Sequence, residues 1–345
     1  MRTRQNNKEN DENADMNIQA LIQQIKKTVR SHELENGGYC RYLSENGHKE
    51  RKTGNNEYGC ADAANILYTV GAFEREPARR QELVSAIRGF QHSDGLFDEG
   101  SHHPIHCTAH CIAALELFDA GALIPLSGFS QYKTKEGLRA LLESLDWVGN
   151  PWSAAHQGAG IYAAMVLSGE VAPDWQDFYF SWLTESADPT YGIGLKGAIA
   201  VGEKPAYHHL NGWFHYLFNF AFAHRKLPYA RQATDTCLQL YRNDRLGDNF
   251  TCSVGFAQID WVYTLNRCSR QEGYRVDEAT AAIRDFAEKY IPYLMTLNHE
   301  SSDKWNDLHL LFGSVCALAE LQNALPGEIE SDYPLKLVLD RRPFI

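Results

Sequence analysis

The sequence predicts an all-α fold built from pairs of helices, and three observations support this prediction. Six segments rich in Ala, Gly, Cys, Leu and aromatic residues recur at intervals of 45 to 55 residues, beginning near Tyr58, His106, Trp152, Tyr207, Cys252 and Trp305. Six segments with charged faces alternate with them, and the alternating apolar and polar runs typical of strands are scarce. A repeat of this length predicts a repeat architecture. Twelve helices, alternately buried and amphipathic, predict an (α/α)6 toroid in which six inner helices surround a central cavity.

The amphipathic segments are the predicted outer helices. Apolar residues at helical spacing predict the first over 17–34, and Pro77, which suits a first helical turn, opens the second over 77–90. The other four are predicted over 134–147, 174–184, 229–242 and 277–297, the last with a bend at Pro292.

The segments with almost no Lys or Arg are the predicted inner helices, over 58–70, 104–118, 152–167, 207–224, 251–267 and 305–322. Connections from an outer to an inner helix are longer than connections back, and the long ones span 40–57, 91–103, 188–205 and 298–304. Long loops commonly carry function, so the chemistry is expected at this end of the ring.

Composition indicates one large domain over 15–345, with a polar disordered tail over 1–14 and an extended C-terminal segment over 323–345. The net charge of −11 argues against nucleic acid and anionic membranes as partners. The N-terminus lacks the apolar run of a secretory signal. The sequence also contains no uncharged run of 18 apolar residues, so we expect no membrane-spanning helix. Eight cysteines without a CxxC pair, most of them in apolar segments, predict packing thiols in a cytoplasmic protein.

One turn gives a family resemblance. Residues 88–97 read Arg-Gly-Phe-Gln-His-Ser-Asp-Gly-Leu-Phe, and residues 108–115 follow as Thr-Ala-His-Cys-Ile-Ala-Ala-Leu. This pattern resembles the repeat of the protein prenyltransferases and squalene-type cyclases, in which a Gln-x-x-Asp-Gly-x-Phe turn joins an outer helix to an inner one. Fainter copies lie at 36–39 and 188–192. Those families are α/α toroids, and the architecture is also similar to six-hairpin glycosidases and toroid polysaccharide lyases. The acidic motifs of the cyclases are absent, and only Asp248, Cys252 and His309 loosely imitate the prenyltransferase zinc site.

Aligning the six inner helices gives two positions, four residues apart, that share one helix face. The first position holds Tyr58, His106, Trp152, Tyr207, Cys252 and Trp305, and the second holds Asp62, His110, His156, Asn211, Phe256 and His309. Aromatic rings stack on the apolar faces of pyranoses, while imidazoles and amides hydrogen-bond hydroxyls. The expected ligand is therefore a small carbohydrate, bound by Tyr58, His106, Trp152, Tyr207, Asn211, Trp213, Trp305 and His309. The alternative for each aromatic side chain is that it simply fills the core.

Asp62 is the predicted general acid or base of a glycoside hydrolase, because its small apolar neighbours would desolvate it. Such an enzyme normally uses a second carboxylate. Asp307 is the predicted second carboxylate, and Asp260, Asp98 and Glu99 are other candidates. His110 and His156 complete the predicted catalytic residues.

Three other functions stay open. A lyase would use Tyr or His as the base, and Asn, Arg or a metal would neutralise a uronate carboxylate; Tyr58, His106, His110, Tyr207 and Asn211 fit that set, with Arg41, Lys196 and Lys204 in loops. The others are a non-catalytic sugar-binding or scaffold toroid and isoprenoid chemistry. No cofactor is expected, with zinc as the alternative: His106 and His110 have metal-ligand spacing, and Asp62 could join His110, His156 or His309.

Overall fold

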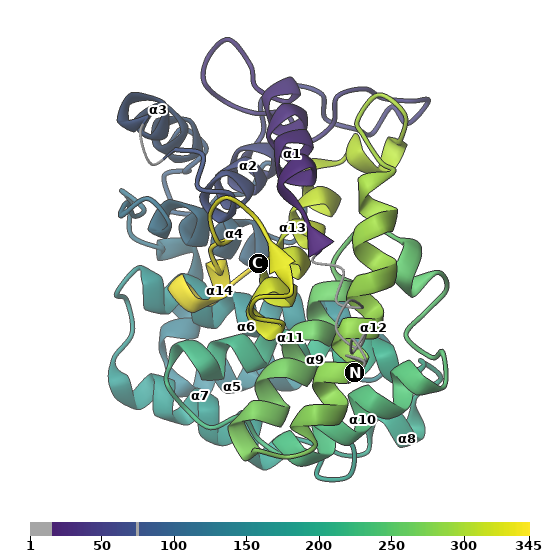
Figure 1. The fold of residues 1–345 in the computed structure, drawn as a ribbon. Coiled ribbons are helices and arrows are strands. Elements are labelled where there is room, and N and C mark those ends of the chain that lie inside the picture. The colour runs from purple at the N-terminus through teal and green to yellow at the C-terminus, as the bar shows by residue number, and fades with distance from the viewer. Residues whose placement is uncertain (1–15, 74–75) are drawn as a thin grey trace, which may run out of the picture.

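The computed structural model describes residues 16–73 and 76–345 and is almost entirely helical (Figure 1). Six helices are largely buried: α2 (Glu57–Thr69), α4 (Pro104–Glu116), α6 (Pro151–Leu167), α9 (Ala206–Phe222), α11 (Ala257–Glu272) and α13 (Leu308–Ala324). Six amphipathic ones precede them in turn: α1 (Gln19–Ser31), α3 (Pro77–Arg88), α5 (Lys135–Ser144), α7 (Pro173–Ser186), α10 (Ala230–Arg242) and α12 (Val276–Met295). The all-α prediction is confirmed. The predicted tail over 1–14 lies outside the described residues.

The buried helices pack in chain order. Helix α2 contacts α4, α4 contacts α6, α6 contacts α9, α9 contacts α11, α11 contacts α13, and α13 returns to α2. The amphipathic helices cover them: α1 lies on α2, α3 on α2 and α4, and α12 on α11 and α13. Stacked rings of Tyr162, Trp175 and Tyr179 join α7 to α6. One continuous apolar core runs through the described residues.

Two buried helices begin later than predicted. Helix α11 begins at Ala257 rather than near residue 251, because Gly255 has a φ of +149° that a helix does not accept. Helix α13 begins at Leu308 rather than at 305, because the Asp307 side chain accepts a hydrogen bond from the His309 backbone N–H and caps the helix. Cys252 and Trp305 therefore lie outside the helices, in the short 3-10 turns η2 (Phe250–Cys252) and η3 (Asp303–Trp305).

The turn recognised in the sequence recurs in three loops. Bridges Glu33↔Tyr39, Gln91↔Phe97 and Ala187↔Leu195 close the three turns. In the second turn, Gly95 has a φ of +87°, which favours glycine, and the Gln91 side-chain Nε2 donates to the carbonyls of Gly95 and Ile124. The turn motif thus fixes how each of these three loops leaves its outer helix.

The C-terminal segment is less extended than predicted. Helix α13 continues to Ala324, strand β2 (Ile329–Glu330) pairs in parallel with β1 (Met16–Asn17), and a short helix α14 (Val338–Arg341) follows. The last residues then turn inward, where Phe344 and Ile345 are buried. Asn219 Nδ2 donates to the Pro343 carbonyl at 3.0 Å. Figure 1 shows this end of the chain among the buried helices.

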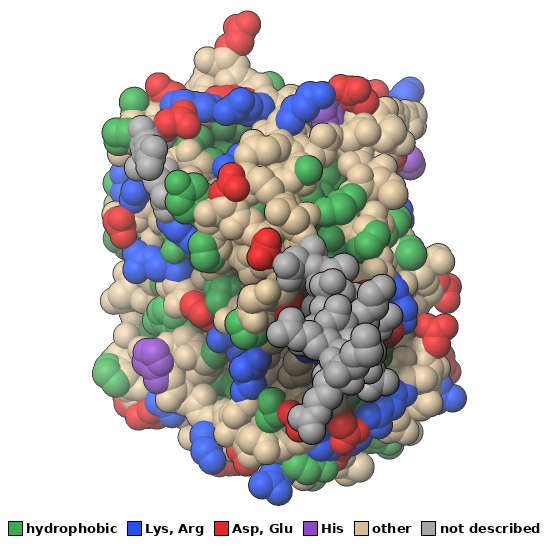
Figure 2. Space-filling view, in the orientation of Figure 1, with side chains coloured by type: hydrophobic (Ala, Val, Ile, Leu, Met, Phe, Trp, Pro, Cys, Tyr) green, Lys and Arg blue, Asp and Glu red, His purple; other side chains and the backbone are tan. Residues whose placement is uncertain are grey.

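The surface mixes charges of both signs. On the face shown in Figure 2, Lys and Arg side chains lie interspersed with Asp and Glu. None of the helices in the described part of the chain combines the length and apolarity required to cross a bilayer. Two further short helical elements in the described residues are η1 (Ser127–Lys133) and α8 (Ala198–Val201).

Gly59 allows α2 to lie against the preceding loop, and replacing it is expected to destabilise the protein. A Cβ atom at this position would lie 2.5 Å from the Cys40 carbonyl carbon and 2.6 Å from the Arg41 backbone nitrogen. Because backbone must move to relieve the clash, Gly59→Ala should lower the free energy of unfolding by about 1–3 kcal/mol in urea denaturation. Gly54→Ala, where a Cβ meets nothing within 4 Å, is the matched control and should change stability little.

Candidate functional site

A cavity of about 320 Å³ opens beside the first turns of α4, α6, α11 and α13 and the middle of α9. Four imidazoles and two aromatic rings contribute to its lining: His106, His156, His215, His309, Trp152 and Phe256. The other described lining residues are small, aliphatic or neutral polar, and none of them is Asp, Glu, Lys or Arg. The cavity therefore presents rings and neutral hydrogen-bonding groups to a ligand.

The cavity histidines form a continuous cluster. Ring centroids lie 4.5 Å apart for His106 and His156, and 5.1 Å apart for His156 and His215. The exposed His102 stacks on His106 at 4.4 Å. Burial lowers the pKa of His106 and His156 well below the usual value, and lowers the pKa of His215 to about 4. These three imidazoles are therefore neutral at physiological pH and keep a lone pair for a proton or a hydroxyl.

Tyr58 fixes the orientation of His106. Its hydroxyl forms a hydrogen bond with His106 Nδ1, which leaves Nε2 as the nitrogen available on the cavity side. Tyr58 is fully buried, and burial raises its pKa well above the usual value, so it remains a phenol. Tyr58 was predicted to bind substrate, but it lies behind His106 and does not line the cavity.

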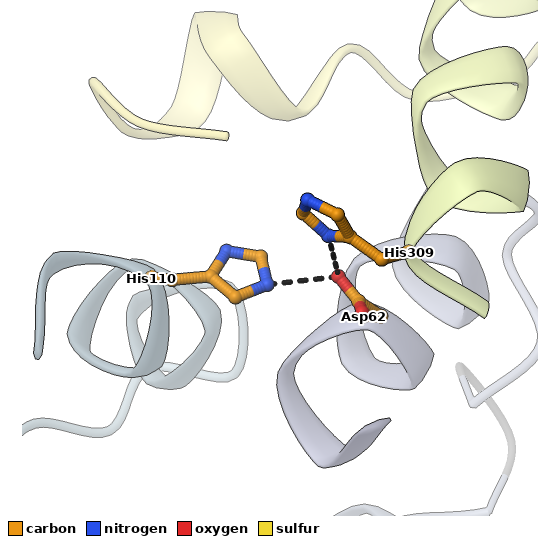
Figure 3. A group of neighbouring side chains, drawn as sticks. All are labelled: Asp62, His110 and His309. Atoms are coloured by element: carbon orange, nitrogen blue, oxygen red, sulfur yellow. Dashed lines mark hydrogen bonds and ion pairs between the residues drawn. The ribbon is translucent and has the colours of Figure 1, made fainter. Parts of the chain in front are cut away.

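Asp62, His110 and His309 converge from α2, α4 and α13 (Figure 3). Asp62 Oδ1 lies 2.8 Å from His110 Nε2 and 2.9 Å from His309 Nδ1. Asp62 and His110 are fully buried, and only His309 of the three lines the cavity. Asp62 Oδ2 is also buried and has no hydrogen-bond partner among the described residues. The sequence alignment thus placed together three side chains that do meet.

The cluster keeps Asp62 ionised. Burial alone would raise the pKa of this carboxyl, but the positive charge that His309 carries when protonated and the hydrogen bonds from His110 and His309 outweigh it, so the pKa is lowered. Burial lowers the pKa of His110, and the hydrogen bond to Asp62 opposes this only in part. A buried, ionised carboxylate held by two imidazoles orients them or binds a cation, rather than donating a proton to a ligand.

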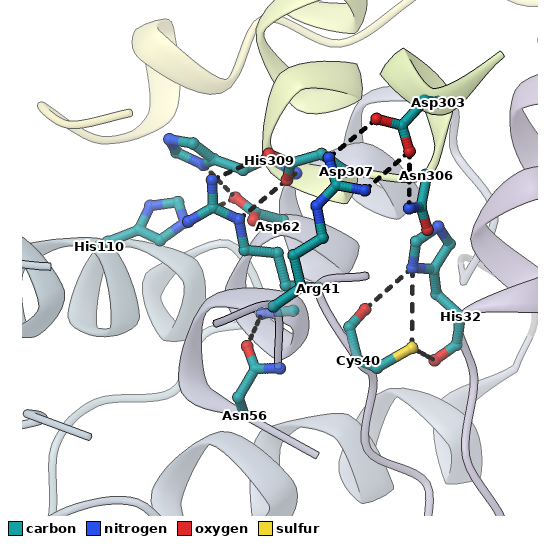
Figure 4. Close-up of polar contacts among 12 residues, drawn as sticks. His32, Cys40, Arg41, Asn56, Asp62, His110, Asp303, Asn306, Asp307 and His309 are labelled. Atoms are coloured by element: carbon teal, nitrogen blue, oxygen red, sulfur yellow. Dashed lines mark hydrogen bonds and ion pairs between the residues drawn. The ribbon is translucent and has the colours of Figure 1, made fainter. Parts of the chain in front are cut away.

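Asp307 is occupied by Arg41 (Figure 4). The guanidinium donates from Nε and Nη2 to the two carboxylate oxygens, both at 2.9 Å. Asp307 also caps α13, and Arg41 lies over the Tyr58 ring at 5.4 Å. This carboxylate therefore has a structural role beside the cluster, and it does not line the cavity.

Four other residues predicted to bind substrate lie away from the cavity lining. Tyr207 stacks on His208 at 4.3 Å, and Trp213 is buried against Tyr216 at 5.5 Å. Asn211 and Trp305 are buried, and their side-chain N–H groups have no partner among the described residues. Asp260, another candidate carboxylate, is fully buried within α11, where burial raises its pKa well above the usual value.

Sequence reasoning missed His215, Gln258 and Ile345, which do line the cavity. His215 lies four residues beyond Asn211 on α9, so extending the i, i+4 pattern by one turn would have found it. Ile345 carries no sequence signal, because it reaches the cavity only through the inward path of the C-terminal segment.

Among the described residues, a group able to hold a metal ion is formed by Asp62, His110 and His309, whose candidate ligand atoms all lie within 4.8 Å of one another. Of the sequence-predicted pair of His106 and His110, His110 belongs to this group, whereas His106 lies outside it and forms a hydrogen bond with Tyr58 through Nδ1. Comparison with protein-family models, curated proteins and solved structures gives no significant match.

Proposed function

We propose that the buried and amphipathic helices form an (α/α)6 toroid, and that its central cavity belongs to a lyase acting on small uronate-containing oligosaccharides. The architecture is supported by the packing of six buried helices in chain order, with α13 returning to α2. A cavity of about 320 Å³ lies at the lower end of the range for small-molecule sites, which suits a short oligosaccharide end.

The observation that carries the reaction type is the set of side chains that line the cavity: four imidazoles and no Asp or Glu side chain among the described residues. Hydrolysis of a glycosidic bond uses two carboxyl groups that flank that bond. Asp62 is covered by His110 and His309, and Asp307 is held by Arg41. Elimination needs a base that removes a proton from carbon, and a neutral imidazole supplies one.

His106 is the proposed base. In the tautomer in which Nδ1–H donates to the Tyr58 hydroxyl oxygen, Nε2 carries the lone pair and accepts the proton from the carbon beside the uronate carboxylate. The electron pair of that C–H bond forms a carbon–carbon double bond, the glycosidic C–O bond breaks, and the leaving oxygen takes the proton from His106, which returns to its neutral form. The ring of His156 lies 4.5 Å from that of His106, so His156 is placed to donate a hydrogen bond to that oxygen. Trp152 and Phe256 offer stacking faces to the sugar.

The test is incubation of the full-length protein with a panel of uronate-containing and neutral oligosaccharides. Ultraviolet absorbance of an unsaturated uronate, rising together with new reducing ends, is the expected result, because only elimination creates that chromophore. New reducing ends without absorbance would replace this proposal with hydrolysis. Saturable binding of a sugar without any product would instead favour a non-catalytic sugar-binding protein.

A further inference from the structure

The proposed reaction requires a cation that the cavity lining does not supply. Removing a proton beside a carboxylate builds negative charge on that carboxylate, and enzymes stabilise such charge with a nearby cation or strong donors. The described lining residues include neither Lys nor Arg. Arg41 is near the cluster, but both of its donating nitrogens in this contact face Asp307.

We propose that Asp62, His110 and His309 bind a divalent metal ion of the zinc class at the edge of the cavity. One carboxylate oxygen and two imidazole nitrogens are a donor set that zinc accepts, and three protein ligands with an open fourth position are typical of catalytic zinc. The binding of the metal follows from these side chains alone. Its role in neutralising a uronate carboxylate rests on the proposed function.

The first support is geometric. Three helices from distant parts of the chain, α2, α4 and α13, bring the ligand atoms within 4.8 Å of one another. Zinc bonds of about 2.0–2.1 Å require tetrahedral ligand atoms to lie about 3.3 Å apart. The carboxylate–imidazole separations of 2.8 and 2.9 Å therefore need to open by only about half an ångström. This is within the reach of side-chain rotation without movement of the helices.

The second support is charge. The group contains two carboxylates, Asp62 and Asp307, and one guanidinium, Arg41, so one negative charge remains to be balanced by a proton on an imidazole or by a bound cation. Buried charges in proteins are paired or coordinate metals.

The third support is an unsatisfied atom. Asp62 Oδ2 is buried without a hydrogen-bond partner among the described residues, an arrangement that is costly for an ionised carboxylate. A cation beside the carboxylate offsets this cost. His309 is the member of the group that lines the cavity, so it places the proposed metal site next to the space for the substrate.

The test is metal content and cobalt spectroscopy on the full-length chain. After growth with zinc and removal of loosely bound ions, elemental analysis should find on the order of one zinc per chain, and Co²⁺ should give the visible bands of a tetrahedral site. Asp62→Asn, His110→Gln and His309→Gln should each lower the zinc content at least tenfold. His215→Gln is the matched control, because this cavity histidine lies outside the group, and it should retain the metal.

Circular dichroism of each variant separates loss of metal from loss of fold. A folded wild-type protein that binds neither Zn²⁺ nor Co²⁺ would overturn the metal site and leave a proton on an imidazole as the compensating charge. Metal binding without any unsaturated product would contradict only the lyase proposal. Unsaturated product formed at full rate by chelator-treated protein would show that elimination does not require the metal.

Discussion

His106→Gln is expected to lower kcat of the proposed elimination by about 10²–10⁴-fold, the usual contribution of a general base. Glutamine preserves the approximate size of the side chain and its capacity to hydrogen-bond with Tyr58, but it does not accept a proton at neutral pH. KM should change little, because stacking on Trp152 and Phe256 is untouched. Initial rates of unsaturated-product formation over a range of substrate concentrations give both constants.

The matched control for this prediction is His208→Gln. His208 is half-buried, stacks on Tyr207 and does not line the cavity, so its replacement should leave kcat unchanged. Tyr58→Phe separates a positioning role from a chemical one, since it removes the hydrogen bond to His106 Nδ1 and keeps the ring. A smaller loss of kcat, with a shifted pH profile, is expected. Equal activity of His106→Gln and wild type would exclude His106 as the base.

The positions of the helices were largely predicted correctly because the composition of each segment is averaged over many residues. Each buried helix is rich in small and aromatic residues over its whole length, and each amphipathic helix has a charged face, so pairs of helices could be recognised without contacts. The starts of α11 and α13 were wrong because single residues decide them. Gly255 prevents α11 from starting earlier, and Asp307 caps α13. A single residue hardly changes the composition of a long segment, so neither start could be predicted from composition.

The candidate site was predictable in part. Asp62 is 48 positions from His110 and 247 from His309, yet they meet because they occupy the same level of the repeat. The alignment failed for α9, where Tyr207 and Asn211 stay off the cavity surface and His215 reaches it one turn deeper. The rotation and depth of a helix depend on packing against its neighbours, which the periodicity of one chain does not encode. The bond between Arg41 and Asp307 joins two loops and was equally invisible.

Acidification below pH 6.5 is expected to destabilise the protein steeply. Burial lowers the pKa of His32 and of His215 to about 4, compared with 6.5 in an unfolded chain. Between these values the unfolded chain binds more protons than the folded one, so the free energy of unfolding rises with pH. The contribution of each group is therefore fully present above pH 6.5 and is lost as the pH falls toward 4.

The expected slope is about 1.4 kcal/mol per pH unit for each such histidine, or roughly 3 kcal/mol per pH unit for the two together. Both side chains are almost completely buried, so solvent screens this effect little. His106 and His156, whose pKa values are also lowered by burial, should add to it. Urea denaturation at intervals from pH 7.5 to pH 5, with chelator present to remove any contribution from bound metal, measures the slope directly.

Variants assign this slope to particular imidazoles. His215→Gln removes one titrating group, so its slope between pH 6.5 and 5 should be smaller by about 1.4 kcal/mol per pH unit, whatever its stability at pH 7.5. His32→Gln should have the same effect on the slope, although His32 lies away from the cavity and contacts the Cys40 carbonyl. Comparing slopes rather than stabilities cancels the packing cost of each substitution. A free energy of unfolding that stays flat down to pH 5 would mean that these imidazoles are hydrated or already charged in the folded protein. The neutral histidine cluster, on which the choice of His106 as base depends, would then be lost.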